Sequence, residues 1–232
     1  MNLAIDTILV PQGAEYRAVC QGLKQAQLDK IQVKSIPIGV DNLPKLRQDN
    51  SFWRTNPQRV LIMGLCGSLS PAHQVGDAVL YQDCFYSDKN CYFTTSQLST
   101  DRKLTDNIYG GLGSQISLVT ALTSNRPICK AREKLSLYRT YPASVVDMEG
   151  FAYLQELQQR GIAVAMLRIV SDGATDELPD LSGAIDFQGN LQTLPLAIAA
   201  IKQPIAAMRL IGGSLKALKV LRYITTKLFI QL

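Results

Sequence analysis

Histidine is almost absent from the sequence: His73, set among turn-forming residues, is the only one in 232 residues. A lone histidine argues against a histidine-based metal site and against a Ser-His-Asp triad. The five cysteines are odd in number and irregularly spaced, and they include no C-x-x-C motif. That pattern argues against a disulfide framework or a zinc site and is typical of a reducing cytoplasm. We expect neither a metal nor a cofactor.

Long apolar runs are also missing. No uncharged apolar stretch approaches the roughly 18 residues of a transmembrane helix, and the start of the chain has no signal-peptide pattern. Charged residues make up 19% and hydrophobic residues 47% of the chain, as in globular proteins. We therefore expect a cytoplasmic protein with one large domain.

Positive charge is concentrated near the C-terminus. Residues 181–232 contain six Lys or Arg residues and one acid, Asp186, so this segment alone accounts for the net charge of +5. Basicity confined to one segment does not predict a nucleic-acid-binding domain. We divide the chain into a catalytic domain at 1–185 and a basic, apolar helical segment of the same domain at 186–232.

Strand-like and helix-like patterns alternate along the first 180 residues. Such alternation predicts an α/β fold, with three α/β/α layers around a mixed, mainly parallel sheet. The clearest apolar, strand-like runs cover residues 3–10, 59–65, 114–122, 143–148 and 162–170, and helical spacing covers residues 13–27 and 150–160.

Polar residues follow several of these runs at the strand ends. Glu15 comes after the first run, a loop with Gly64 and Gly67 after the second, and Glu149 and Asp172 after the last two. Ligands of open α/β sheets bind beyond the carboxyl ends of the strands. A crossover of 23 residues links Glu149 to Asp172, so we expect both at one edge of the sheet, facing one pocket.

Each feature also has a simpler explanation. Glu15 and Glu149 could be ordinary acids in a first helical turn, where a carboxylate favours the helix dipole. Asp172 could be the N-cap of the turn that follows it. The "GLCGSL" loop is neither G-x-G-x-x-G nor a P-loop, and it could be only a tight turn. The shared position and order of the four features favour a site.

The motifs that carry these residues resemble one enzyme family. "VPQGAEYRAV", "VLIMGLCGSLSPAHQVGDAVL", "VVDMEGFAYLQEL" and "LRIVSDGATDELP" are similar, in this order, to the nucleoside phosphorylase superfamily. Within it they resemble the 5′-methylthioadenosine/S-adenosylhomocysteine nucleosidases. The tail "GAIDFQGNLQTLPLAIAAIKQPIAAMRLIGGSLKALKVL" is similar to hopanoid-associated enzymes, which release adenine from adenosylhopane.

This resemblance implies cleavage of a purine N-glycosidic bond, without a cofactor. Asp172 would serve N7 of the leaving base, held by Ser171 and Arg168. Met148 and Glu149 would bind the ribose, with Glu149 accepting hydrogen bonds from its hydroxyls. The loop would contact substrate through its residues Gly64, Leu65, Cys66 and Gly67.

The nucleophile could be water or phosphate. Glu15 matches the glutamate that activates water in the nucleosidases, and Leu65 replaces the hydroxyl residue that binds phosphate in the phosphorylases. Both features favour hydrolysis, because a carboxylate repels phosphate. Arg17 and Ser68 could still bind an anion, so phosphorolysis remains an alternative. A non-catalytic nucleoside- or lipid-binding protein is the second alternative, although it would need neither a general acid nor a water activator.

Recognition of the base departs from the family pattern. The nucleosidases carry an aromatic residue that stacks on adenine, and this chain aligns Ser124 or Asn125 with it. Stacking of a base on an aromatic ring contributes about 1–3 kcal/mol in nucleic-acid proteins. Phe151 is our candidate for a compensating aromatic residue. If no aromatic residue compensates, the base could differ from adenine.

The C-terminal segment has two interpretations. Its Leu, Ile and Ala residues with periodic Lys and Arg predict helices broken at Pro204 and at Gly212-Gly213. These helices could close the domain by packing on the sheet, or they could form a basic amphipathic surface in peripheral contact with a membrane. Relatives form dimers or hexamers, so by resemblance we expect a homodimer.

Overall fold

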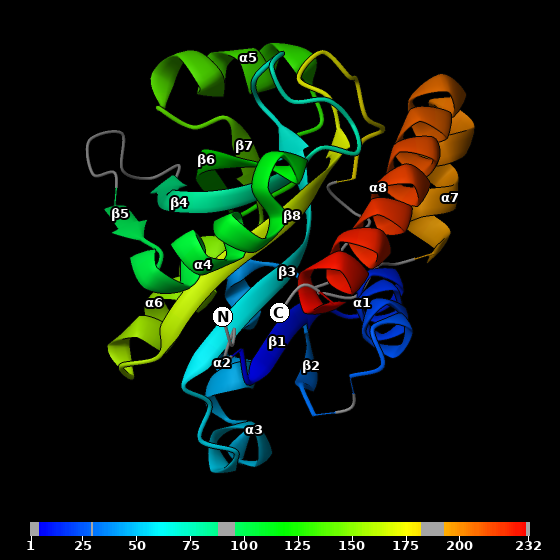
Figure 1. Ribbon diagram of the computed structural model, residues 1–232. Coiled ribbons are helices and arrows are strands. Elements are labelled where there is room, and N and C mark those ends of the chain that lie inside the picture. The colour runs from blue at the N-terminus through cyan, green and yellow to red at the C-terminus, as the bar shows by residue number, and fades with distance from the viewer. Residues whose placement is uncertain (1–4, 29, 88–95, 182–192, 231–232) are drawn as a thin grey trace.

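The computed structural model describes residues 5–28, 30–87, 96–181 and 193–230 (Figure 1). Its strands form one eight-stranded sheet, in which the described residues make five parallel and three antiparallel pairings. The predicted α/β fold with a mixed, mainly parallel sheet is confirmed. The strands are β1 (Thr7–Pro11), β2 (Gln32–Ile36), β3 (Arg59–Ser68), β4 (Ala78–Ser87), β5 (Ser96–Ser99), β6 (Ile116–Ser124), β7 (Val145–Asp147) and β8 (Ala163–Asp172).

Part of the sheet closes on itself, which the sequence did not predict. β3 pairs with both β7 and β8, β8 pairs with β4, and β6 joins β4 to β7, so five strands form a ring. The register of the β3–β8 pairing shifts after Cys66 and Val170, so Ser171 is an extra residue in β8, and such a bulge bends the strand that carries it. The end of β3, at Gly67 and Ser68, also pairs with β7 in antiparallel orientation. β7 and β8 are not neighbours, but both pair with the end of β3, so the crossover expected between Glu149 and Asp172 returns the chain to the same edge of the sheet.

Helices cover both faces of the sheet. One core packs α1, α4 and α8 against it, and a second core packs α2, α3 and α6 on the opposite face. The helices are α1 (Ala14–Gln25), α2 (Leu43–Arg47), α3 (Asn50–Arg54), α4 (Arg102–Leu112), α5 (Ala131–Thr140), α6 (Gly150–Gln159), α7 (Thr193–Lys202) and α8 (Pro204–Ile230), with short 3₁₀ turns η1 (Val40–Asn42) and η2 (Gly113–Gln115).

The long helix α8 lies against α1 and β8, with α7 beside its first half (Figure 1). The predicted break at Pro204 is confirmed, but the break at Gly212-Gly213 is wrong because α8 continues through both glycines. A Cβ on Gly213 would lie 2.1 Å from the backbone oxygen of Ser171. The residue is therefore small because the helix approaches β8 closely.

The second half of α8 has a fully buried side, formed by residues such as Ala217, Leu221 and Leu228. This packing is what the first interpretation of the tail predicted. Within the described residues, no helix has the length and apolarity needed to cross a membrane. Residues 183–192 of the tail motif lie outside the described residues.

Candidate active site

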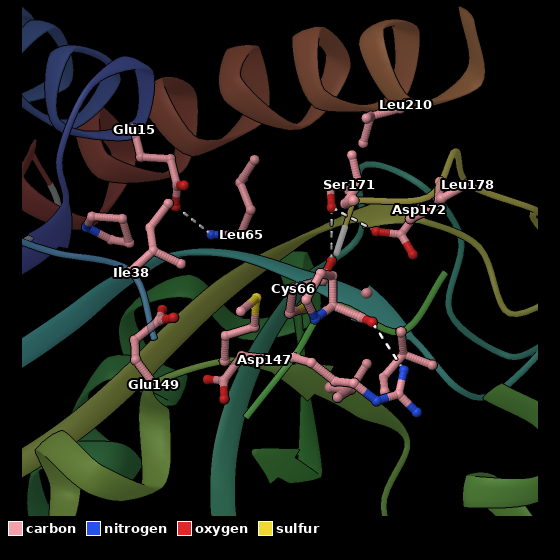
Figure 2. Close-up of a pocket in the computed structure, with 18 residues that line it drawn as sticks. Glu15, Ile38, Leu65, Cys66, Asp147, Glu149, Ser171, Asp172, Leu178 and Leu210 are labelled. Atoms are coloured by element: carbon pink, nitrogen blue, oxygen red, sulfur yellow. Dashed lines mark hydrogen bonds between the residues drawn. The ribbon is translucent and has the colours of Figure 1, made fainter. Parts of the chain in front are cut away.

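A cavity of about 240 Å³ lies where several strands end (Figure 2). Glu15 reaches it from the first turn of α1, and Leu65, Cys66 and Gly67 reach it from β3. The end of β7 with the two residues after it, and the end of β8, complete the polar wall. From these two segments come Asp147, Met148, Glu149, Ser171 and Asp172.

At one end of the cavity, Glu15 is held by the glycine-containing part of β3. Its Oε2 accepts a hydrogen bond of 2.7 Å from the backbone N–H of Leu65. A Cβ on Gly64, whose φ is +154°, would lie 2.6 Å from this oxygen and 2.2 Å from Nη1 of Arg168. Glycine is therefore required for β3 to approach both side chains. The expected loop is wrong, because β3 continues through Gly64 and Gly67 to Ser68.

Arg168 is the fully buried cation of this end. Its Nη2 lies 2.9 Å from Oε1 of Glu149 and 3.4 Å from Oδ2 of Asp147. Glu149 is the N-cap residue of α6 but makes no capping hydrogen bond among the described residues. Its carboxylate is directed to the cavity and to Arg168. We call the cluster of Glu15, Asp147, Glu149 and Arg168 the acidic end.

One cation for three carboxylates leaves the acidic end rich in negative charge. Burial raises the pKa of Glu15 to about 7, and the charge of Glu149 adds to the rise. Arg168 and the N–H of Leu65 act in the opposite direction. Burial also raises the pKa of Glu149, against the attraction of Arg168. A carboxyl group with a pKa near 7 is well placed to take up a proton at neutral pH.

At the other end of the cavity, Asp172 has one partner for each oxygen. Nζ of the fully buried Lys134 lies 2.5 Å from Oδ2, and Ser171 Oγ lies 2.9 Å from Oδ1. Gly67 allows this approach, since a Cβ there would lie 2.8 Å from Oδ2. Asp172 is therefore no simple helix cap. We call the cluster of Lys134, Ser171 and Asp172 the paired end.

A family model described as "Phosphorylase superfamily" matches residues 32–202 of this chain. The chain belongs to the phosphorylase superfamily. The motifs around Glu149 and Asp172 predicted this family, and the match identifies the chain as an enzyme that cleaves N-glycosyl bonds. A comparison with curated protein sequences gives no match.

Solved structures of the same fold cover nearly the whole chain. The futalosine hydrolase of Helicobacter pylori has a TM-score of 0.72 and 16% identity, with 97% of each chain covered. The 5′-methylthioadenosine/S-adenosylhomocysteine nucleosidase of the same organism has a TM-score of 0.71, 16% identity and the same coverage. The corresponding nucleosidase of Campylobacter jejuni has a TM-score of 0.62 and 15% identity, covering 95% of this chain and 100% of its own. At such identities the likeness shows the fold alone.

Several predicted site residues of this superfamily member do not line the cavity. Arg168 lies behind the wall, where it contacts Asp147 and Glu149, and Gly64 lies against the Glu15 carboxylate. Phe151 is buried in the core, where its ring stacks on Tyr86 at 5.6 Å, so it does not replace the missing aromatic residue. Ser124 is also buried, because β6 extends to this residue and the chain turns only after it.

The two candidate phosphate ligands are also outside the cavity wall. Arg17 is exposed on α1, and the Ser68 hydroxyl donates to the backbone oxygen of Ser70 at 2.6 Å. Neither residue is among those that line the cavity. Cys66 does line it, but burial raises the pKa of its thiol, which therefore stays protonated and does not act as a nucleophile.

Other lining residues were missed from the sequence. Arg126 and Ile128 occupy the wall that we had aligned with Ser124 or Asn125, and Leu210 of α8 closes the cavity from above (Figure 2). Asp147 belongs to the "VVDMEG" motif, and its position two residues before Glu149 could have indicated that both side chains lie at the same cavity. Lys134, which lies behind the wall and pairs with Asp172, gave no signal in the sequence, since a lysine on an amphipathic helix normally lies in solvent.

Proposed function

We propose that this protein hydrolyses the N-glycosidic bond of a 5′-substituted adenosine and releases adenine. One observation carries the proposal: Glu15, Glu149 and Asp172 surround a single cavity that has about the volume of a small ligand. Two of the similar structures, a nucleosidase and a futalosine hydrolase, support a nucleoside substrate.

The two ends of the cavity match the two demands of the reaction. The base leaves more easily when N7 is protonated, and Asp172 at the paired end would supply that proton. The ribose passes through an oxocarbenium-like state, which the negative charge of the acidic end stabilises. Glu149 would accept hydrogen bonds from the ribose hydroxyls while Met148 packs on the sugar. Glu15 would take the proton of the attacking water.

Water is the nucleophile that this site favours. Phosphate binding needs cationic or hydroxyl donors, and the candidates Arg17 and Ser68 lie outside the wall. Arg126 does line the cavity but is paired with Glu133 through both nitrogens of its guanidinium fork. The surplus of carboxylates would repel phosphate. Phosphorolysis therefore remains only the alternative.

The 5′ substituent is expected to be apolar. The side chains of Ile128, Leu178, Leu181 and Leu210 form an apolar part of the cavity wall. Burying a methylthio or longer alkyl group there would contribute about 25 cal/mol for each Å² removed from water. A substituent as large as that of adenosylhopane belongs to this proposal and would have to extend beyond the cavity.

We further propose that the protein is a cytoplasmic enzyme that contacts an anionic membrane surface through α7 and the first half of α8. Large apolar side chains protrude there, with Ile201 81% and Met208 66% exposed. Exposed Lys202, Arg209 and Lys216 lie on the same helices. Such a surface combines apolar insertion with attraction to anionic lipid. A homodimer is expected from the resemblance.

The membrane proposal is tested by co-sedimentation with vesicles containing phosphatidylserine. The protein should pellet at low salt and be partly released by salt. A Met208→Ser and Ile211→Ser double variant should pellet less than the wild type. Absence of pelleting at low salt would leave α8 as a packed helix only. Size-exclusion chromatography would report the oligomeric state.

The hydrolysis proposal is tested by chromatography of the free base. Adenosine, 5′-methylthioadenosine, S-adenosylhomocysteine and a long 5′-alkyl adenosine are each incubated with and without phosphate. Equal adenine release in both conditions supports hydrolysis. Release only with phosphate, giving ribose 1-phosphate, would establish the alternative. No release from any substrate would favour another base or a binding protein.

A further inference from the structure

Lys134 is a fully buried charge that touches the cavity only through Asp172. The residue lies on α5 and its side chain has no exposed surface. Its Nζ lies 2.5 Å from Asp172 Oδ2, 2.8 Å from the Gly173 carbonyl and 3.4 Å from the Asp176 carbonyl. These three acceptors match the three N–H donors of an ammonium group. The fold therefore places a lysine with three acceptors around its Nζ directly behind the wall.

Ser171 allows Asp172 to exist in either charge state. Its hydroxyl lies 2.9 Å from Asp172 Oδ1 and 3.1 Å from the carbonyl of Cys66. A hydroxyl has one proton to donate and can also accept. When Asp172 is ionised, Ser171 can donate to Oδ1. When Oδ1 carries a proton, the Ser171 hydroxyl can accept a hydrogen bond from it and donate its own hydrogen bond to the carbonyl of Cys66 instead.

A purely structural pair would have no reason to lie at this position. Buried ion pairs are often replaceable by apolar residues without loss of stability, so they are weak evidence for a stabilising role. This pair has its carboxylate in the cavity wall and its cation behind the wall. We propose that Lys134 is a positioning residue that orients Asp172 and supplies the proton that Asp172 gives to the leaving base. The inference rests on the proposed function.

The step balances as follows. The C1′–N9 bond breaks and its electron pair stays with the base, while N7 takes the proton of the Asp172 carboxyl group. Asp172 takes a proton from the Lys134 ammonium, and Lys134 regains one through Asp172, which faces the emptied cavity after the base has left. Water adds its hydroxyl to C1′ and gives its proton to Glu15.

The test compares substrates that do and do not need a proton on the leaving group. Lys134→Met keeps the length of the side chain and removes its charge. Its kcat on 5′-methylthioadenosine should fall at least about 100-fold, the lower range for loss of acid catalysis. Its kcat on p-nitrophenyl β-D-ribofuranoside, or on an N7-methylated purine nucleoside, should stay within about threefold, because these leaving groups depart unprotonated. Lys134→Arg should recover part of the lost rate.

The matched control is Lys130→Met, which removes an exposed lysine near the start of the same helix, paired with Glu177 at 3.6 Å. It should behave as the wild type on both substrates. Adenine binding by Lys134→Met is measured by calorimetry and should persist, which shows that the pocket is folded. Two results for Lys134→Met would overturn the inference. One is an equal loss of kcat on both kinds of substrate together with lost adenine binding, and the other is no loss of kcat on either. A wild type that cleaves no nucleoside would instead overturn the proposed function.

Discussion

The two ends of the cavity hold their carboxylates in different ways. At the acidic end, Glu15, Asp147 and Glu149 share one arginine, and burial raises the pKa of both glutamates. At the paired end, Asp172 has a lysine of its own. A surplus of negative charge suits the place where a sugar cation forms, whereas a lysine behind Asp172 can replace the proton that Asp172 gives to the base. The difference indicates which step each end serves.

The largest effects should come from removing the reacting group at each end. Asp172→Asn and Glu15→Gln should each lower kcat on 5′-methylthioadenosine by about 10²–10⁴-fold, the range for one acid–base group. On p-nitrophenyl β-D-ribofuranoside only Glu15→Gln should remain slow, because that substrate still needs an activated water. Steady-state kinetics on both substrates separate the two ends. An Asp172→Asn variant with near-wild-type kcat would remove Asp172 from its proposed role.

Removing the shared arginine should cost the most stability. Arg168→Met would leave Asp147 and Glu149 as uncompensated buried carboxylates, and breaking a buried pair in this way costs about 3–5 kcal/mol. The free energy of unfolding in urea measures the loss. Arg102→Met is the control, since Arg102 makes an exposed pair with Asp106 at 3.7 Å. Equal urea midpoints of unfolding for Arg168→Met and Arg102→Met would contradict the contribution of the shared arginine to stability.

A smaller effect concerns the backbone that supports the paired end. A Cβ on Gly213 would lie 2.1 Å from the Ser171 oxygen, whereas a Cβ on Gly212 would meet nothing within 4 Å. Gly213→Ala should therefore destabilise the protein by about 1–3 kcal/mol, as overpacking does. Gly212→Ala should stabilise it by about 0.5–1 kcal/mol through the helix backbone. Only Gly213→Ala should also lower kcat, because it displaces Ser171. A change in stability of the same sign in both variants would refute the close approach of α8 to β8.

The same glycines show what the sequence can and cannot predict. The α/β class and the common position of Glu15, Glu149 and Asp172 were predictable, because strand ends and local motifs encode them. The break at Gly212-Gly213 was not, because only the neighbouring strand explains why Gly213 is small. Lys134 was missed for a similar reason: its helix looks solvated, and burial of one lysine depends on contacts distant in sequence. The bulge at Ser171, within the ring of strands, is likewise indicated by no residue pattern.

The last effect is specific to the acidic end: Glu15→Gln should stabilise the protein in a pH-dependent way. Burial raises the pKa of Glu15 to about 7 in the folded chain, against an ordinary value of 4.5. Between these values the folded state holds a proton that the unfolded state has lost, so stability falls as pH rises through the window. Glu15→Gln removes this penalty. Its Tm should exceed that of the wild type at pH 8, with the difference vanishing near pH 4.

Activity should rise with pH over the range in which stability falls. Glu15 takes up a proton only when it is ionised, so kcat/KM of the wild type should rise with pH through about 7. The acidic end would then lose stability over the same range in which it gains reactivity. Melting curves by differential scanning fluorimetry at pH 4, 6 and 8, beside a pH–rate profile, measure both trends. A Tm difference that is constant across pH would show that the proton on Glu15 does not couple to folding, and the contrast between the ends would then rest on geometry alone.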